Sequence, residues 1–332
     1  MEPEIISFEE NKEIKLNQTG ILKLYAEELT AKQYITNPAI ARESEIKKMI
    51  IVLLTPEKSS LLVGHAGIGK TAIVEGLAYL IQTNQVPDAL KGYKIYKINS
   101  TSLLGTMIID GREEMKIGLL VDELKSMEKT ILFIDEVHTL IGGSEDGPMD
   151  LANILKPALD RGDVKAIGAT TTQEYNLYVV KDRAFLRRFE KIEVVEPNID
   201  TTVKILLGSL PKIEKQTGVK FKYNNYISER LIRSIVEATS EYKRVYGLAA
   251  MYPDVSFSVL TQAFSNALFN NKTEVNILDV YNAIKNSKRI YPDSIVKELI
   301  DFKEKNADIA KSDKIVLPTV TIDEVKNEYD SF

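Results

Sequence analysis

Residues 64–71 read Gly-His-Ala-Gly-Ile-Gly-Lys-Thr and stand between an apolar run, SLLV, and a helix-compatible stretch, TAIVEGLAYLIQ. A glycine-rich loop between a strand and a helix is the setting of a phosphate-binding loop. Its glycines let backbone N–H groups turn inward, and the following helix N-terminus adds the positive end of its dipole. The alternative is a chance glycine-rich turn, which the context on both sides disfavours. We therefore expect phosphate to bind at Gly64, His65, Ala66, Gly67, Ile68, Gly69, Lys70 and Thr71.

A second motif indicates the chemistry that would act on a bound phosphate. The apolar run at 131–134 delivers Asp135 and Glu136 at its end, and ligands sit at the carboxyl ends of the strands in open α/β sheets. With ATP in the loop, Lys70 is expected to reach the β- and γ-phosphates, and Thr71 and Asp135 to hold Mg²⁺. Glu136 would then polarise the attacking water. Alone, two acids at a strand end are often only solvated; paired with the loop, they predict ATP hydrolysis.

Two further groups of residues allow two interpretations each. Thr171 follows the apolar run at 166–169, so its hydroxyl could sense the γ-phosphate, or it could cap the next helix. Arg187 and Arg188 precede the run KIEVV. They are either a solvated surface pair or arginine fingers that reach the γ-phosphate of a neighbouring subunit. The second interpretation requires an oligomer.

Five short apolar runs predict buried strands, and helix-compatible stretches separate them. The runs lie at residues 61–63, 93–98, 131–134, 166–169 and 192–195. This alternation predicts an α/β fold, a five-stranded parallel sheet with flanking helices, followed by a smaller all-helical lid domain. We divide the chain into an N-terminal arm and lead-in helix (1–30), a large α/β domain (31–197), the lid (198–287), and a helical extension with an acidic tail (288–332).

Composition narrows the function classes. The 332 residues carry 43 basic and 48 acidic side chains, a formal charge of −5, so nucleic acid is not an expected partner, although a local basic surface would escape this count. The chain has no cysteine and two histidines, His65 and His138, which leaves little material for a zinc site or a Ser–His–Asp triad. The N-terminus does not resemble a secretory signal and no apolar run is long enough to span a membrane. We expect a cytoplasmic protein.

In this order the motifs resemble the first ATPase module of the Clp unfoldases and disaggregases (ClpA, ClpB, ClpC), a AAA+ family. The likeness runs from residue 22 to about residue 265. It is carried by LKLYAEELT (22–30), NPAIARESEI (37–46), GHAGIGKTAIVEGLA (64–78), ILFIDEVHTLIG (131–142), MDLANILKPALDRGDVKAIGATTTQEY (149–175) and AFLRRF (184–189).

The resemblance implies a AAA+ P-loop fold, Mg²⁺-dependent ATP hydrolysis and a homo-oligomer, a hexameric ring. It also implies that the segment at 37–46, with Ile40, lies on the adenine side of the nucleotide. Glu136 would be the catalytic glutamate, Thr171 the first sensor, and Arg187 with Arg188 the fingers acting on a neighbouring subunit.

This sequence departs from the family pattern at three places. Ala41 stands where glycine is usual, and Tyr252-Pro253-Asp254-Val255 stands where the family reads Leu-Pro-Asp-Lys. Ile108-Ile109-Asp110-Gly111 replaces the Lys-Tyr-Arg-Gly pore loop that grips an extended substrate, so Ile108 and Ile109 offer apolar contact without an aromatic surface. The family's adaptor domain, coiled-coil insertion and second module do not fit in 332 residues, and we expect no barrel-peptidase partner.

Three functions are compatible with these residues. The first is a chaperone-like ring motor that uses ATP to remodel, unfold or disassemble a protein partner. The second is a nucleotide-switched assembly factor, resembling a helicase loader, that threads no substrate. The third, an inactive binding module, is disfavoured because Lys70, Asp135, Glu136 and Arg187 have a joint purpose only if hydrolysis occurs.

Overall fold

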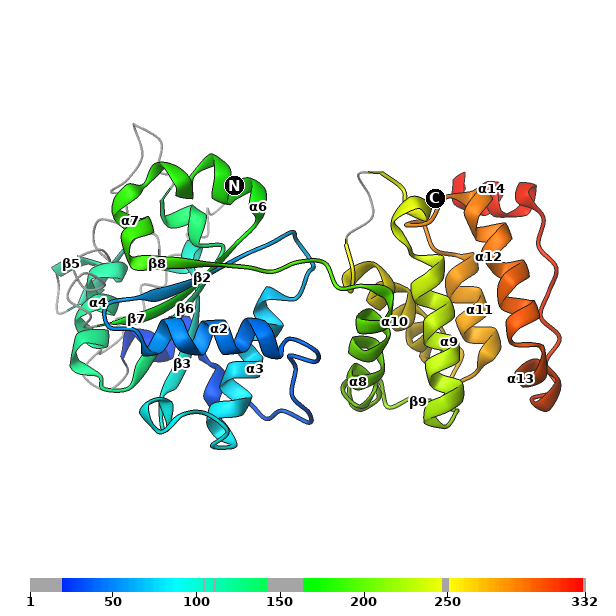
Figure 1. Cartoon of the computed structure of the whole chain (residues 1–332), viewed down its shortest axis with the longest axis horizontal. Helices are drawn as coiled ribbons and strands as arrows, with labels where there is room; N and C mark the ends of the chain where they lie inside the picture. Colours follow the sequence, from blue (N-terminus) through cyan, green and yellow to red (C-terminus); the bar gives the residue numbers. More distant parts are fainter. Residues whose placement is uncertain (1–19, 104, 110–111, 142–163, 247–250, 331–332) are drawn as a thin grey trace, which may run out of the picture.

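The computed structural model describes residues 20–103, 105–109, 112–141, 164–246 and 251–330. Its first part is a six-stranded sheet with strand order β1-β3-β6-β7-β2-β8, in which every pairing is parallel except that of β1 with β3 (Figure 1). The strands are β1 (Ala26–Glu28), β2 (Ser59–Val63), β3 (Lys94–Asn99), β6 (Thr130–Asp135), β7 (Lys165–Thr170) and β8 (Phe189–Glu193).

Helices cover the sheet on both faces, because side chains alternate along each strand. Leu62, Ile131 and Phe133 share one core with the helices α2 and α3. Leu61, Leu132 and Ile134 point the other way and share a second core with α1 and α4. The helices of this part are α1 (Ile21–Tyr25), α2 (Glu43–Leu54), α3 (Lys70–Gln82), α4 (Lys116–Ser126), α6 (Thr172–Leu177) and α7 (Arg183–Arg188), with short 3-10 turns η2 (Leu29–Ala31), η3 (Asp88–Leu90), η4 (Ser100–Leu103), η5 (Val137–Leu140) and η6 (Val179–Lys181).

The sequence-based α/β prediction is confirmed, and three details differ. The sheet has a sixth strand, because the expected lead-in helix at 22–30 is helical only to Tyr25. The next three residues form β1, where pairing with β3 overrides the local helical pattern. The last strand runs over Phe189–Glu193 instead of 192–195, since its pairing with β2 begins at Ser59 opposite Phe189, and Val195 is 61% exposed.

The second part of the chain is a bundle of helices with its own core, on the right in Figure 1. Its helices are α8 (Ile199–Thr217), α9 (Asn225–Ala238), α10 (Asp254–Phe269), α11 (Ile277–Lys285), α12 (Pro292–Lys305), α13 (Ala307–Ser312) and α14 (Ile322–Asp330), with the turn η7 (Glu241–Lys243) and the short strands β9 (Lys220–Phe221) and β10 (Glu274–Val275). The C-terminal segment packs on this bundle: the Tyr281 hydroxyl donates to the Pro318 carbonyl at 2.7 Å, and Val325 is buried. The four-segment division drawn from the sequence stays a prediction.

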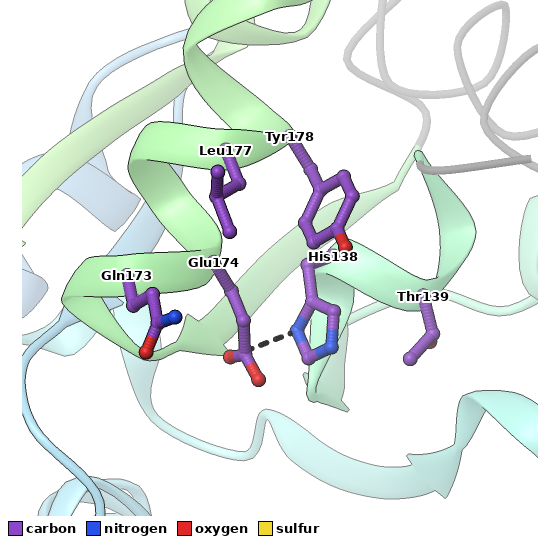
Figure 2. A pocket seen from close by; sticks show the side chains of 6 residues that line it. All are labelled: His138, Thr139, Gln173, Glu174, Leu177 and Tyr178. Atoms are coloured by element: carbon purple, nitrogen blue, oxygen red, sulfur yellow. Dashed lines mark ion pairs between the residues drawn. The ribbon is translucent and has the colours of Figure 1, made fainter.

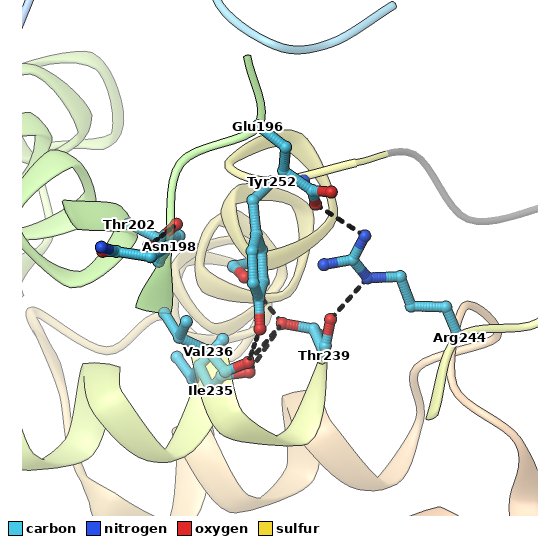
Figure 3. Close-up of polar contacts among 9 residues, drawn as sticks. Glu196, Asn198, Thr202, Ile235, Val236, Thr239, Arg244 and Tyr252 are labelled. Atoms are coloured by element: carbon cyan, nitrogen blue, oxygen red, sulfur yellow. Dashed lines mark hydrogen bonds and ion pairs between the residues drawn. The ribbon is translucent and has the colours of Figure 1, made fainter. Parts of the chain in front are cut away.

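A polar cluster attaches the connection between the two parts to the helical bundle (Figure 3). The Glu196 carboxylate accepts a hydrogen bond from the Arg244 guanidinium at 2.8 Å and from the Tyr252 backbone N–H at 2.7 Å. Arg244 also donates to the Thr239 carbonyl at 2.7 Å and lies over the Tyr252 ring, 4.2 Å from its centroid. The connection is therefore fixed to the helical bundle at Glu196.

Among the residues that the structure describes, no helix combines the length and the apolar character that crossing a membrane requires.

Candidate functional site

The phosphate loop leads from the buried end of β2 into the first turn of α3. Gly69 is the residue before the helix and has a left-handed backbone, with φ of 99°, which glycine adopts without strain. Gly64 passes so close to the Val194 carbonyl that an added Cβ would lie 2.4 Å from it. No side chain caps α3, so the first N–H groups of this helix remain available to an anion.

The Lys70 ammonium folds back over this loop. It donates to the carbonyls of Gly64 at 2.8 Å and His65 at 2.9 Å. Burial lowers the pKa of Lys70, although the negative charges of Asp135 and Glu174 oppose that shift. A partly buried ammonium whose hydrogen bonds, among the described residues, go only to carbonyls is well placed to bind an anionic phosphate.

Two oxygen-bearing side chains from separate elements meet beside the loop. The Thr71 hydroxyl, at the start of α3, donates to the Asp135 carboxylate, at the end of β6, at 3.2 Å. The Lys97 ammonium, on neighbouring β3, forms an ion pair with the same carboxylate oxygen at 3.0 Å. A hydroxyl and a carboxylate at this separation match the hard oxygen ligands that Mg²⁺ takes from proteins, where phosphates and water complete the shell. The residues thus fit Mg²⁺.

Glu136 and the threonines at the end of β7, Thr170 and Thr171, complete one hollow of about 340 Å³ around the loop. Residues from four elements surround it: Ala66, Gly67, Ile68, Gly69, Lys70, Thr71, Asp135, Glu136, Ala169, Thr170, Thr171 and Glu174. Glu136 has a left-handed backbone, with φ of 54°, which is uncommon for a residue with a side chain. Such strained positions cluster at functional sites.

Thr171 caps the helix α6, as one of its two sequence-based interpretations required. Its hydroxyl oxygen accepts from the Glu174 N–H at 3.2 Å, and the Glu174 carboxylate accepts from the Thr171 N–H at 3.0 Å. This reciprocal pair is a capping box. A hydroxyl that accepts through a lone pair still has its proton to donate. Capping therefore does not exclude the other interpretation, contact with a phosphate or a water.

The Arg42 side chain holds the phosphate loop in place, a role that the sequence did not predict. Its guanidinium is buried and donates to the Ile68 carbonyl at 2.9 Å, the Val195 carbonyl at 3.1 Å and the Glu45 carboxylate at 2.8 Å. It thereby connects the loop to the chain after β8. Of these three partners, only Glu45 is close to Arg42 in the sequence. The Ile68 and Val195 carbonyls are distant in sequence, so no local pattern predicts these contacts.

Ile40 lies beside a second hollow of about 380 Å³, between the loop side of α3 and the helical bundle. The large domain contributes residues 32–38, Ile40, Ala72 and Glu75, and the bundle contributes Ile205, Gly208, Ser209, Lys212, Lys215, Gln216, Pro253 and Phe257. Helix α3 borders both hollows, through Thr71 in one and Ala72 in the other.

The structure separates Arg187 and Arg188 from this site. They precede β8, whose first residue pairs with the first residue of β2, while the phosphate loop follows the last residue of β2. Five residues of strand put the arginines about 16 Å from the loop. Arg188 forms an ion pair with Glu57 at 2.8 Å, and the Arg187 side chain is exposed. These arginines cannot serve the phosphate site of their own subunit in this arrangement.

Ile108 and Ile109 lie on a two-stranded hairpin, β4 (Thr106–Ile109) with β5 (Arg112–Met115). Ile108 is 50% exposed, while Ile109 is partly buried. Asp110 and Gly111 lie outside the described residues, as do residues 142–163, which include most of the predicted segment 149–175. Of the predicted site residues, only Ile40, the two arginines and the two isoleucines therefore lie away from the phosphate loop and its hollow.

Residues 60–197 match the model of the AAA family, the ATPase family associated with various cellular activities. The chaperone protein ClpB of Aquifex aeolicus is 40% identical over 256 residues, which are 76% of this chain and 24% of that protein. The Clp ATP-binding subunit ClpE of Bacillus subtilis is 40% identical over 252 residues, 75% of this chain and 34% of that protein.

Two solved structures of Hsp104 have a similar fold. The Saccharomyces cerevisiae Hsp104:casein complex has a TM-score of 0.65 at 36% identity and covers 78% of this chain and 44% of its own. A closed state of Hsp104 with ATPγS and FITC casein has a TM-score of 0.70 at 31% identity, and the match covers 94% of this chain and 52% of the Hsp104 chain. The chain spans about a quarter to a third of the length of the two curated relatives. It belongs to the AAA ATPases and is a relative of the Clp and ClpB proteins.

Proposed function

We propose that this chain is the MgATP-hydrolysing unit of a ring motor that remodels a protein partner. The observation that carries the proposal is the convergence of Lys70, Thr71, Asp135, Glu136 and Thr171 on one hollow. Each residue comes from a strand end or from the start of α3, and together they offer the groups that phosphoryl transfer needs: a cation for the phosphates, oxygen ligands for a metal, a base and a hydroxyl donor.

Each residue has one role in the proposed reaction. Lys70 and the N–H groups of the loop bind the phosphates. Thr71 and Asp135 hold Mg²⁺, which when bound neutralises charge on the β- and γ-phosphate oxygens. Glu136 orients the attacking water and takes its proton. The Thr171 hydroxyl donates toward the γ-phosphate or the water, while the base of the nucleotide lies in the second hollow beside Ile40.

A ring supplies what a single subunit lacks. Arg187 and Arg188 lie at the far end of β8 from the phosphate loop, so they can stabilise transition-state charge only at the site of a neighbour. The ring is a proposal, as is the hexameric number. A mixing experiment tests it: Lys70→Ala and Arg187→Ala subunits, each inactive alone, should recover part of the ATP turnover when combined, because some interfaces then hold one intact set of groups.

Protein remodelling draws its support from the relatives. The Hsp104 structures were solved with casein, and we propose a non-native polypeptide as the partner of this chain. Unfolded casein should then raise ATP turnover. Fluorescent casein should bind with ATPγS and dissociate as ATP is hydrolysed. If casein leaves turnover unchanged over its full concentration range and nucleotide leaves casein binding unchanged, the remodelling proposal is wrong.

The hairpin favours a second candidate, a nucleotide-switched assembly factor that does not thread its partner. Ile109 stands at the position of the family's aromatic residue and is partly buried, while Ile108 beside it is exposed, and neither offers a flat ring surface. Ile109→Ala distinguishes the candidates. Loss of casein-stimulated turnover with unchanged basal turnover supports contact with a substrate chain. Unchanged stimulation supports the switch.

A further inference from the structure

The Glu174 carboxylate, which is not among the predicted catalytic residues, lies between two neighbouring hollows. Glu174, in the first turn of α6, lines the phosphate hollow together with Lys70 and Glu136. It also lines an adjacent hollow of about 400 Å³ with His138 and Tyr178 (Figure 2). The sequence pattern Thr-x-x-Glu at 171–174 accounts for a helix cap, but a cap gives no reason for the contact with His138.

The Glu174 Oε2 atom has three hydrogen-bonding neighbours. It accepts from the Thr171 N–H at 3.0 Å and from the Thr170 hydroxyl at 3.2 Å, and it lies 3.1 Å from Nδ1 of His138. Burial disfavours the charged form of this carboxyl, but the bonds from Thr171 and Thr170 and the nearby His138 outweigh burial and hold the pKa of Glu174 below its ordinary value. The carboxylate is therefore ionised at neutral pH.

His138 is itself fixed from two sides. It belongs to η5, the turn that begins directly after Glu136. Its ring stacks on that of Tyr178, at the end of α6, with centroids 6.1 Å apart and planes at 21°. The side chain is only 15% exposed. His138 thus contacts α6 near its start, through Glu174, and at its end, through Tyr178.

We propose that Glu174 is a positioning residue for ATP hydrolysis: through His138 it fixes the Thr170 and Thr171 hydroxyls relative to Glu136. The chain of contacts runs from Glu136 along two residues of backbone to His138, then to the Glu174 carboxylate, and from there to both threonines. Glu174 touches no reacting atom. Its effect is on the alignment of Glu136 with Thr171, and misalignment by about 1 Å can lower a rate about a hundredfold. This inference rests on the proposed hydrolytic site.

The chain contains a matched control. Residues 321–324 repeat the pattern Thr-x-x-Glu: the Thr321 N–H donates to the Glu324 carboxylate at 2.8 Å, and the Glu324 N–H donates to the Thr321 hydroxyl at 3.4 Å. This cap belongs to α14 in the helical bundle. Glutamine also completes a capping box, so Glu174→Gln and Glu324→Gln make the same chemical change in two caps, of which only the first faces a histidine.

The test is the steady-state ATPase rate, with nucleotide affinity and melting temperature measured in parallel. We expect Glu174→Gln to lower kcat about tenfold or more while KM stays within about twofold, and Glu324→Gln to leave both unchanged. His138→Phe keeps the stacking on Tyr178 and the Thr171 cap, so it should lower kcat similarly. Because Glu174 and His138 act as a unit, the variant that carries both substitutions should have a kcat only slightly below that of the slower single variant.

Two results would overturn the inference. One is a Glu174→Gln enzyme whose kcat matches that of Glu324→Gln. The other is a loss explained by weaker ATP binding or by unfolding, with His138→Phe retaining full kcat. If Glu174→Gln does not fold, His138→Phe decides alone. A Glu136→Gln enzyme that keeps normal turnover is a separate outcome, since it refutes the hydrolytic site itself and not the role of Glu174 within it.

Discussion

The Lys97 ammonium lies 3.0 Å from Oδ2 of Asp135, the same oxygen that accepts from the Thr71 hydroxyl. At the proposed Mg²⁺ site, Lys97 therefore competes with the metal ion for Asp135. A half-buried ion pair of this kind is worth up to about 1 kcal/mol. We expect Lys97→Met to lower the Mg²⁺ concentration for half-maximal ATPase about two- to fivefold. Lys94→Met is the control, because Lys94 is on the same strand but pairs with Glu28 at 3.6 Å. An unchanged or higher Mg²⁺ requirement contradicts this account.

Arg42 should matter for both stability and nucleotide binding. Arg42→Met leaves the Glu45 carboxylate buried without its partner and frees the Ile68 carbonyl, so we expect a loss of about 3 kcal/mol in unfolding free energy and weaker ATP binding. Arg233→Met is the comparison: Arg233 also has two acidic partners, Asp200 and Glu229, but its side chain is 36% exposed, and its loss should cost less than about 1 kcal/mol. Urea unfolding measures both, and equal losses would show that burial of the Arg42 pair is unimportant.

Lys70 should contribute a pH-dependent term to the stability of the nucleotide-free protein. Its pKa is lowered by burial in the folded state, so between the folded value and the unfolded value of 10.5 the unfolded chain binds more protons and stability rises with pH. A comparison with Lys70→Met separates the contribution of Lys70 to the pH dependence of stability from the contributions of the other titratable groups. The unfolding free energy of the wild type, relative to the variant, should increase as the pH rises toward 10.5. A constant difference would show that burial of the ammonium is not costly.

ATP should also stabilise the wild type and not Lys70→Met. Ligand that binds only the folded state raises its stability by about 2.7 kcal/mol at a hundred times its dissociation constant. The melting temperature with and without MgATP measures this effect. An equal rise in both proteins would place the phosphates elsewhere.

The attachment at Glu196 gives a prediction about the connection between the two parts. Arg244→Met removes the bonds to Glu196 and to the Thr239 carbonyl while keeping an apolar chain over Tyr252. We expect a loss of about 2 kcal/mol in the stability of the helical bundle. Hydrogen exchange should show faster exchange at the Tyr252 N–H, which donates to the same Glu196 carboxylate. Arg289→Met, which removes a more exposed pair with Asp254, serves as the control.

Features formed by residues that are close together in the sequence were predictable from it. The glycines of the loop, the helix after it and the carboxylates after β6 are neighbours in the chain, so motif spacing and apolar runs were enough to place them at one edge of a parallel sheet. The helix cap at Thr171 was one of the two roles that the sequence allowed for this residue. Its geometry follows from the four-residue pattern Thr-Thr-Gln-Glu, in which the first and last residues form the capping box.

The remaining features depend on contacts between distant segments. Arg42 reaches a carbonyl 153 residues away, and Lys97 meets Asp135 only because β3 pairs with β6. Strand β1 exists because β3 offers an open edge to residues whose own pattern is helical. The separation of Arg187 from the loop follows from the register of β8 on β2. None of these leaves a periodic or motif-like signal.

The most direct test of the central claim is ATP turnover by Glu136→Gln. Glutamine has nearly the shape of glutamate but cannot take a proton, so the variant should bind MgATP with wild-type affinity and hydrolyse it at least about a hundredfold more slowly. Single-turnover hydrolysis together with a nucleotide-binding measurement separates the two steps. Turnover within about twofold of the wild type would contradict the account, because the hollow at the phosphate loop would then not be where ATP is hydrolysed.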